Sequence, residues 1–512
     1  MQDWSEGYVT EIGYTHGYYP ELNPVRARLA LLASSIVPPD TQVACELGFG
    51  QGVSVNIHAA AGTAQWYGTD FNPAHAGFAR ELAGQGELAG RLHDDAFEAF
   101  CRRTDLPDFD FIGLHGIWSW ISDANRAILA DFLRRKLKVG GVVYVSYNTQ
   151  PGWGAIAPLR DLLTGHADAL SPGGADTAGR VDAALDFADR LLASGAGYGR
   201  ANPGVAEYLK SLRKHNHQYL AHEYFNENWM PMPFSRMASC MEAQKLQFAG
   251  SASLIEHVPE VNFTSDQRKI LDEIPDARFR ETIRDFMLNQ RFRRDYWVRG
   301  VRRLTPFELA ERVRAQHVVL AALPETVDLK IQGALGEAAL HAGVYQPIID
   351  QLAERPYCTL GELEQAIARH KVTLGQLLQA ILVLTAKGAV HPAQEPAQAE
   401  QARAAATQLN TRLCRMARYG EDIGMLASPV TGGGIPVGRL EKLFLLARGQ
   451  GMTAPEQWAQ LAYATLAAQN QRLMKDGTAI DKPEDQLAEL ERQAREFAGR
   501  RLSMLEALGV SA

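Results

Sequence analysis

The chain has 512 residues, more than one hydrophobic core usually organises, so we expect two to four domains. Its 46% hydrophobic and 22% charged residues are typical of a globular protein and exclude a disordered or fibrous one. The formal net charge of -7 argues against a broad basic field for nucleic acid, and the five cysteines are too far apart for a zinc knuckle or a dense disulfide framework.

The first residues, 1–17, are polar and aromatic and lack the basic start and apolar core of a secretory signal. No later stretch offers eighteen uninterrupted apolar residues. We therefore expect a cytoplasmic protein with no membrane insertion.

From residue 41 to residue 147, short apolar runs alternate with amphipathic stretches, which is the pattern of a βαβ series and of a parallel sheet. Asn72 and Pro73 supply an N-cap and a first-turn proline for one of the helices. Strands are predicted at Val43–Leu47, Gln65–Thr69, Arg91–His93, Phe109–His115 and Gly141–Tyr147. The fold class predicted is therefore α/β, with a doubly wound, Rossmann-like core.

Beyond this core the chain is predicted to be mainly helical. Residues 166–179 are typical of a linker and residues 195–204 of an exposed loop. Residues 359–392 give helix, turn, helix and strand, a winged-helix-like outline, and residues 393–406 form an Ala/Gln/Glu-rich connection to a C-terminal helical region.

The strongest local signal is Glu46-Leu-Gly-Phe-Gly-Gln-Gly52, directly after the first strand. Its glycines, Gly48, Gly50 and Gly52, allow a sharp turn and a close approach to a ligand. A dinucleotide site would require glycine where Val53 stands, and the Glu46 carboxylate would repel a pyrophosphate but attract a cationic amino acid.

Acidic residues follow the next two strands as well. Asp70, with Phe71 behind it, can accept hydrogen bonds from both hydroxyls of a ribose. Asp95, Ala96 and Phe97 follow the third strand, where a carboxylate can receive an adenine amino group and an aromatic ring can cover the base. Together the three strand ends predict a site for an adenosyl ligand that carries an amino acid, which is S-adenosylmethionine.

At this point the sequence resembles the bacterial, rickettsial-type protein lysine methyltransferases with a methyltransferase regulatory domain. The resemblance covers nearly the whole chain and rests on long peptides: Phe111–Trp120 (FIGLHGIWSW), Tyr144–Trp153 (YVSYNTQPGW), Tyr219–Asn226 (YLAHEYFN), Arg291–Asp295 (RFRRD) and Ala427–Pro436 (ASPVTGGGIP). The N-terminal segment Tyr14–Tyr19 departs from the aromatic and proline-rich approach of the relatives.

The resemblance implies a class I methyltransferase core with a mostly parallel seven-stranded sheet, followed by largely helical domains. It implies a homodimer that methylates lysines of other proteins, including outer-membrane proteins. Carried over by position, Glu46, Gly48 and Gly50 would hold the methionine end, Asp70 the ribose and Asp95 the adenine, while His115 would lie beside the sulfonium.

On this basis we expect four parts along the chain. They are an S-adenosylmethionine-binding domain over residues 1–165, a helical insertion with the regulatory or middle domain over 166–300, a winged-helix-like domain over 301–400, and a C-terminal helical domain over 401–512.

Methyl transfer from a sulfonium is an in-line displacement, so the protein must align a neutral amine and exclude water. A dry aromatic pocket disfavours the charged form of lysine and attracts methylated ammonium groups. The aromatic candidates are Tyr14, Tyr18, Tyr19, Trp118, Trp120, Tyr147 and Trp153. Tyr147, Asn148 and His115 are the candidates for orienting the amine or relaying its proton, with core packing as the alternative role for several of them.

Other signals are set aside. His215, His217 and His222 lack an acidic or cysteine partner, so no metal is expected. The arginine-rich run over residues 291–303 is interpreted as an amphipathic helix whose arginines pair with acidic neighbours, and Gly432–Gly434 as a structural turn. The sequence leaves open an acceptor that is a small molecule, peptide or glycan, and a sensor or scaffold that binds S-adenosylmethionine without turnover.

Overall fold

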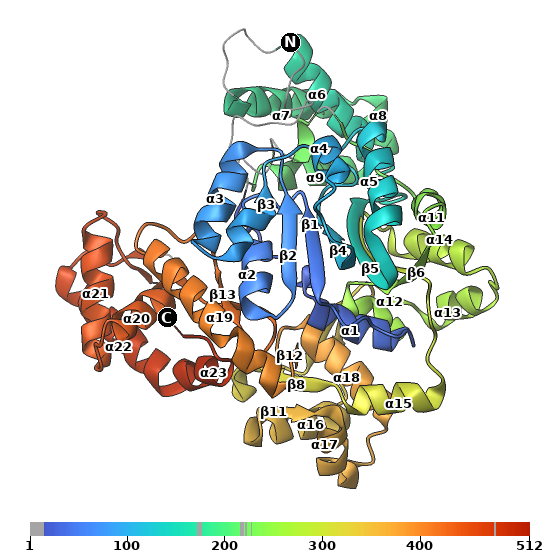
Figure 1. Cartoon of the computed structure of the whole chain (residues 1–512). Helices are drawn as coiled ribbons and strands as arrows, with labels where there is room; N and C mark the ends of the chain where they lie inside the picture. The colour runs from blue at the N-terminus through green and yellow to red at the C-terminus, as the bar shows by residue number, and fades with distance from the viewer. Residues whose placement is uncertain are drawn as a thin grey trace.

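The computed structural model describes residues 15–170, 177–215, 220, 223–226, 228–475 and 478–511. At its centre lies a seven-stranded sheet with the order β3-β2-β1-β4-β5-β7-β6 (Figure 1). The strands are β1 (Val43–Leu47), β2 (Gln65–Thr69), β3 (Leu92–His93), β4 (Phe109–Leu114), β5 (Leu137–Asn148), β6 (Leu246–Ser251) and β7 (Phe292–Arg299). β7 pairs antiparallel with β5 and with β6, whereas the other neighbouring strands of this sheet pair parallel, so the predicted α/β class and mostly parallel sheet are confirmed.

Apolar clusters lie on both faces of the sheet. A strand can contribute to both of them, because successive residues of a strand point to opposite sides. In β5, Tyr144 belongs to the apolar cluster on one face, whereas Val143, Val145 and Tyr147 belong to the cluster on the other. The first face carries α1 (Pro24–Ala33), α2 (Val53–Ala61) and α3 (Pro73–Ala83). The second carries α4 (Phe97–Arg102), α5 (Asp123–Lys136) and α11 (Phe234–Glu242), with α14 (Ala277–Leu288) packed on α11.

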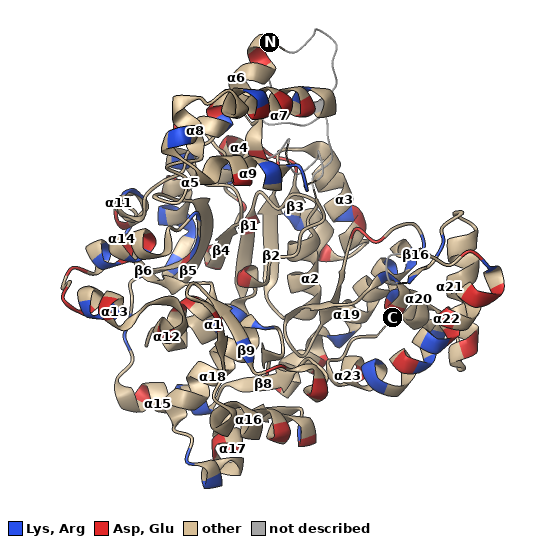
Figure 2. Cartoon of the chain, turned by 180° about the vertical axis from the view of Figure 1, so that it is seen from behind, with Lys and Arg blue, Asp and Glu red and all other residues tan. Residues whose placement is uncertain are grey.

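A small helical unit follows β5 and lies at the top of Figure 1. It contains α6 (Ala157–Leu170), α7 (Thr177–Ala193), α8 (Gly197–Ala201) and α9 (Gly204–Leu212), which enclose a separate apolar cluster. Helices α7, α13 (Ser265–Asp272) and α22 (Pro483–Glu496) carry both acidic and basic residues (Figure 2). Of the predicted linker, residues 166–170 belong to α6 and residues 177–179 to α7, while residues 171–176 lie outside the described ranges; residues 197–201 of the predicted loop form α8.

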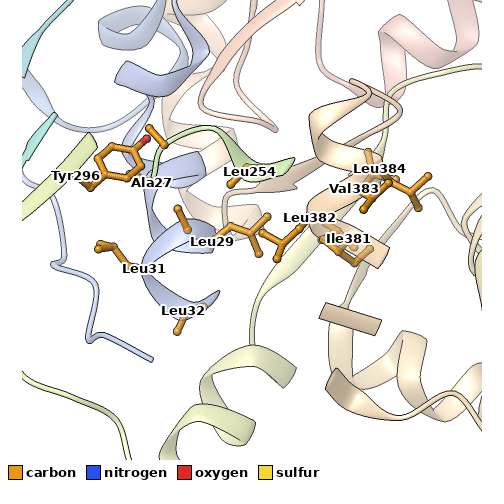
Figure 3. Packing of buried hydrophobic residues seen from close by; sticks show 14 of the residues in the cluster. Ala27, Leu29, Leu31, Leu32, Leu254, Tyr296, Ile381, Leu382, Val383 and Leu384 are labelled. Carbon is orange, nitrogen blue, oxygen red and sulfur yellow. The ribbon is translucent and has the colours of Figure 1, made fainter. Parts of the chain in front are cut away.

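The next region contains the predicted helix–turn–helix outline. Helices α16 (Ala342–Glu354), α17 (Leu360–Ala366) and α18 (Leu374–Ala386) pack beside a sheet of β11 (Tyr357–Thr359), β8 (His317–Leu320) and β12 (Val390–Ala393). Leu254 lies between Leu29 of α1 and Leu382 of α18 (Figure 3). One core therefore joins this region to the central sheet.

Further elements lie in the segment between β6 and α16. They are α12 (Pro259–Asn262), α15 (Pro306–Arg314), and the hairpin of β9 (Lys330–Gly333) and β10 (Gly336–Ala339).

The C-terminal region packs on α2 through α19 (Pro396–Met416) and the hairpin of β13 (Met425–Ser428) and β14 (Gly433–Pro436). Beyond the hairpin lie α20 (Arg439–Gly449), α21 (Pro455–Ala467), the strands β15 (Met474–Lys475) and β16 (Thr478–Ala479), α22 and α23 (Leu502–Ala507). The interpretation of residues 393–406 as a connection is wrong, because most of them form the first half of α19 with Ala399, Ala402 and Ala406 buried.

The interpretation of the arginine-rich run as a helix is also wrong, because it forms β7 between β5 and β6. The acidic partners expected there do exist: Arg293 is buried and pairs with Glu281, Asp285 and Asp295.

Since β6 and β7 lie within residues 246–299, residues 1–165 hold five of the seven strands. The four domain boundaries stay a prediction. Among the helices of the described ranges, none is both long and apolar enough to cross a bilayer.

Candidate active site

The loop between β1 and α2 is shaped by three glycines in the left-handed region. Gly48, Gly50 and Gly52 have φ angles of 74°, 57° and 70°, which favour glycine over residues with a side chain. A Cβ atom on Gly48 would lie 2.2 Å from the Ile117 side chain. The loop therefore leaves its backbone open to close approach, as the spacing of the glycines predicts.

Asp70, at the end of β2, is held under this loop. Its Oδ2 accepts a hydrogen bond of 2.8 Å from the Gly50 amide, and its Oδ1 accepts one of 3.1 Å from the Asn72 amide. The His75 Nδ1 lies 3.2 Å from the same Oδ1. The carboxylate thus links the glycine loop to the first turn of α3.

Glu46 lies on β1 beneath the loop and is 2% exposed. Its Oε2 has no hydrogen-bond partner among the described residues. Burial, reinforced by the nearby Asp70 carboxylate, raises the pKa of Glu46 well above its usual range. A buried oxygen without a donor is unfavourable, so this position suits a ligand that brings a cationic or hydrogen-bonding group.

A cavity of about 670 Å³ opens above these groups, and we call it the inner pocket. It lies at the carboxyl ends of β1, β2 and β4, where open α/β sheets bind their ligands. Its walls are Tyr19, Gly48, Phe49, Gly50, Asp70, Phe71, His75, Phe97, His115, Gly116, Ile117, Trp120 and Ile121.

Four of the predicted ligand-binding residues, Glu46, Gly52, Asp95 and Ala96, are not on the wall of the inner pocket. Gly52 stands behind the loop as the N-cap of α2, against Ala79. Asp95 carries a side chain that is paired with Arg103 at 3.2 Å, and Ala96 is the N-cap of α4. Asp95 still follows the strand next to Asp70, because Asp70 N donates to the His93 carbonyl at 3.1 Å.

A second cavity of about 990 Å³ adjoins the first, and we call it the outer chamber. It shares Tyr19, His115, Gly116 and Trp120 with the inner pocket, and its other walls are Thr15, Asn148, Trp153, Glu223, Arg291 and Phe292. Four of the predicted acceptor residues, Tyr19, Trp120, Trp153 and Asn148, therefore meet in one place. Four of the chamber's ten wall residues are Tyr, Trp or Phe, and His115 adds a fifth ring.

His115 separates the two cavities. Its ring stacks on Tyr19 with the centroids 3.5 Å apart, and its Nδ1 lies 2.8 Å from the Tyr144 hydroxyl. Burial, with a smaller effect from Arg294, lowers the pKa of His115 to about 3. The imidazole is therefore neutral at physiological pH and adds no positive charge between the cavities.

Other predicted residues lie apart from the cavities. Tyr18 accepts a hydrogen bond of 2.7 Å from the Gly434 amide and lies 3.2 Å from the His58 Nε2, so it belongs to the contact with the C-terminal region. Trp118 is 1% exposed and packs in the core on the α5 side. Tyr14 lies outside the described residues.

Tyr147 points away from the chamber, because it alternates with Ser146 and Asn148 along β5. Its hydroxyl donates a hydrogen bond of 2.8 Å to Asp295 Oδ2, and the same carboxylate accepts from Arg293. Burial raises the pKa of Asp295 to about 6 in spite of that arginine. Asn148, by contrast, faces the chamber, and its Nδ2 has no partner.

Several wall residues were missed in the sequence analysis. His75 could have been suspected from its place one turn into the helix after Asp70, but Glu223, Arg291 and Phe292 come from segments whose approach to β5 no local pattern indicates. Within the described ranges no cluster of three or more His, Cys, Asp or Glu residues could hold a metal ion. Of the three histidines weighed for a metal, His217 and His222 lie outside those ranges.

Comparison with known proteins agrees with this geometry. Residues 216–299 match the family described as a predicted methyltransferase regulatory domain. An uncharacterized protein of Synechocystis is 40% identical over 516 residues, which span 99% of this chain and 100% of that protein. An uncharacterized protein of Rickettsia prowazekii is 26% identical over 219 residues, 38% of each chain.

Among solved structures, PKMT2 from Rickettsia typhi in complex with AdoHcy superposes with a TM-score of 0.68 at 15% identity, over 94% of this chain and 98% of that one. A second structure of PKMT2 from Rickettsia typhi gives a TM-score of 0.63 at 15% identity, over 98% of this chain and 99% of that one. The predicted fold and family are thereby confirmed. The chain belongs, with its Synechocystis relative, to the bacterial methyltransferase family that carries this regulatory domain, and it has the class I methyltransferase fold.

Proposed function

We propose that this chain is an S-adenosylmethionine-dependent N-methyltransferase whose acceptor is the side-chain amine of a lysine in a protein. One observation carries the proposal: the inner pocket, lined by glycines and by the Asp70 carboxylate, shares four wall residues with the outer chamber. A donor site and an acceptor site that share a wall are what transfer between two bound molecules requires.

The residues of the inner pocket fit the donor. The unpartnered Glu46 Oε2 would receive the amino group of its methionine end, the loop of Gly48 and Gly50 would lie against that end, and Asp70 would accept from the ribose hydroxyls. Phe71 and Phe97 would cover the adenine, with Asp95 at its edge. When bound, S-adenosylmethionine supplies a methyl group activated by a positive sulfur.

The residues of the outer chamber fit an amine. A lysine with a pKa of about 10.4 is protonated at neutral pH, and burial of its amine among aromatic rings favours the neutral form. Aromatic rings such as Tyr19, Trp120 and Trp153 also attract methylated ammonium groups, by about 0.5 to 2 kcal/mol each. His115, held neutral between the cavities, would align the two molecules without repelling a cation.

The finer parts of the proposal rest on the family resemblance. They are a homodimer, a cytoplasmic location, and an outer-membrane or surface protein as the acceptor. The name of PKMT2 and the AdoHcy bound to it support the same choice of donor.

Two measurements on the purified full chain test the proposal. Calorimetry with S-adenosylhomocysteine should give saturable binding, and absence of binding would contradict the donor assignment. Tritium from labelled S-adenosylmethionine should then enter protein in a bacterial lysate, with mass spectrometry placing the label on lysine. Label confined to low-mass material would favour a small-molecule, peptide or glycan acceptor, and binding without transfer would favour a sensor.

A further inference from the structure

The outer chamber contains a single carboxylate among its wall residues, that of Glu223. The other titratable walls are the neutral His115, the Tyr19 hydroxyl and the Arg291 guanidinium. Arg291 is exposed, and its guanidinium lies over the Tyr208 ring at 5.0 Å from the centroid. The Glu223 carboxylate is thus the one negative group that a ligand in the chamber would meet.

This carboxylate lacks an ordinary partner. Within the part of the chain that the structure describes, no hydrogen bond or ion pair is made by Glu223. Arg160 of α6 is the cation whose charge acts on it; this side chain donates to the Asn226 carbonyl and lies over the Trp229 ring at 4.7 Å. Burial raises the pKa of Glu223 to about 7, and the attraction of Arg160 offsets only part of that effect.

The surroundings of Glu223 are aromatic. Trp153 packs edge-on against Trp229 with the centroids 4.9 Å apart, and the hydroxyls of Tyr208 and Tyr224 are hydrogen-bonded to each other behind them. Such walls lower the polarity around the carboxylate and strengthen its attraction for a cation that enters. They attract an ammonium group through their faces as well.

We propose that Glu223 is the acceptor-binding residue of the chamber, which anchors an alkylammonium group and takes one proton from it. The proposal rests on the proposed function and adds the group that receives the proton. A carboxylate oxygen of Glu223 would accept the hydrogen bond of the ammonium, the N–H bond would break and an O–H bond would form. The products are a neutral amine, whose lone pair is then available, and a neutral carboxylic acid.

The transfer is uphill by about 3 to 4 pKa units, because the ammonium has a pKa of about 10.4 and Glu223 one of about 7, but turning two buried charges into a neutral acid and a neutral amine offsets part of this cost. Asn148 lies on the same wall and could orient the amine through its amide, which has one atom without a partner. The acid would release its proton to water after the product leaves. No metal is needed for this step.

The test uses n-butylammonium, which has the length and charge of a lysine side chain, and n-butanol as its neutral counterpart. Their binding to the wild-type full chain is measured by ligand-observed NMR between pH 6 and pH 8, where the amine stays protonated. With the pKa of Glu223 at about 7, the affinity for n-butylammonium should rise about tenfold over this range as the carboxylate forms. Butanol binding should stay constant, and an equal affinity for the cation at both pH values would overturn the proposal.

The variant Glu223→Gln should remove this pH dependence and weaken n-butylammonium binding at pH 8 by about 10- to 100-fold. The matched control is Glu207→Gln on α9, where an exposed carboxylate pairs with Lys210 at 2.8 Å, and it should bind as the wild type does. Undiminished binding by Glu223→Gln would overturn the proposal. If that variant does not fold, the wild-type pH profile still decides.

A separate measurement shows whether the proposed function itself fails. S-adenosylhomocysteine binding is measured by calorimetry on the wild type and on Glu223→Gln, and both should bind it equally because Glu223 is not on the inner pocket. A wild-type chain that does not bind it would refute the donor assignment, whereas the n-butylammonium titration contains no donor and judges Glu223 alone.

Discussion

At the scale of single residues, the site is organised around the Asp70 carboxylate. Asp70 accepts from the Gly50 and Asn72 amides and contacts His75, so its carboxylate is oriented before any ligand arrives. An oriented acceptor loses little conformational freedom on binding, which favours affinity. Glu46 is the opposite case, since its Oε2 has no partner until a ligand supplies one.

Replacing Asp70 by Asn tests the oriented carboxylate. Asp70→Asn keeps the shape of the side chain but removes its charge and half of its acceptor capacity, so we expect S-adenosylhomocysteine binding to weaken by about 2 to 4 kcal/mol in calorimetry. Asp94→Asn is the control, because Asp94 is paired with Arg80 at 2.8 Å on the surface. An unchanged affinity in Asp70→Asn would show that the ribose contact is misplaced.

A second prediction concerns His58, which is 1% exposed and lies beside Tyr18. Burial lowers its pKa to about 3 from an ordinary 6.5, so the unfolded chain takes up the proton first. The stability that neutral His58 contributes is therefore present above pH 6.5 and lost as the pH falls below it, by about 2 kcal/mol at pH 5.

The measurement is urea unfolding of the wild type and of His58→Gln at pH 8 and at pH 5. The wild type should lose more stability than the variant over this interval. His370→Gln, at an exposed histidine, should behave as the wild type does. Equal losses in the wild type and in His58→Gln would contradict the low pKa.

Sequence reasoning at this scale could bring residues together where local spacing sets their position. The glycine loop, Asp70 and Phe97 lie on or beside one pocket because each follows a strand of the same parallel sheet. It could not place Tyr147, whose neighbour Asn148 reaches the chamber while Tyr147 faces Asp295. A shift of one residue along a strand reverses the face, and the peptide around Tyr147 does not reveal which face is which.

At the scale of elements, the turn from β1 into α2 depends on the packing of α2 against α3. Gly52 has a φ of 70°, and a Cβ atom there would lie 2.4 Å from the Ala79 Cβ on α3. The same residue thus ends the loop and allows two helices to approach each other.

Gly52→Ala should therefore destabilise the protein by about 2 to 5 kcal/mol, the sum of left-handed strain and overpacking. Because the helices would have to separate, S-adenosylhomocysteine binding should weaken too. Gly77→Ala on α3 is the matched control, since nothing lies within 4 Å of its added Cβ, and it should be neutral or slightly stabilising. Chemical denaturation measures both, and a Gly52→Ala variant as stable as the wild type would refute the packing argument.

The elements themselves were predictable to different degrees. The strands of the parallel core were found within a few residues because buried strands are short apolar runs between helices. The strand β7 was taken for a helix because its arginines suggested a solvated face, yet Arg293 is 4% exposed and is neutralised by three acidic residues. Burial of a charge by such partners depends on the tertiary structure and is invisible in the local pattern.

At the scale of the whole molecule, the N-terminal segment, the methyltransferase sheet and the C-terminal region share cores and hydrogen bonds. The hairpin of β13 and β14 receives Tyr18, and the Asn23 amide donates to the Thr431 carbonyl at 3.1 Å. The neighbouring Tyr19 forms part of both cavities, so the distant hairpin supports the wall of the site.

Tyr18→Phe tests this support. The Gly434 amide would lose its acceptor, so the free energy of unfolding should fall by about 1 to 3 kcal/mol. Binding of S-adenosylhomocysteine by the folded protein should change little, because Tyr18 is not a wall residue of the inner pocket. Tyr419→Phe, at a tyrosine that is 78% exposed, should leave thermal unfolding unchanged. A large loss of ligand affinity in Tyr18→Phe alone would instead give Tyr18 a direct role.

The hydrogen bond between Gly434 and Tyr18 joins residues that are 416 positions apart. At synthesis rates of about 5 to 20 residues per second, the segment leading to Tyr19 waits roughly 20 to 80 s on the ribosome before its partner emerges. The contact that supports the wall between the two cavities is therefore made late in translation, and a half-made chain lacks it.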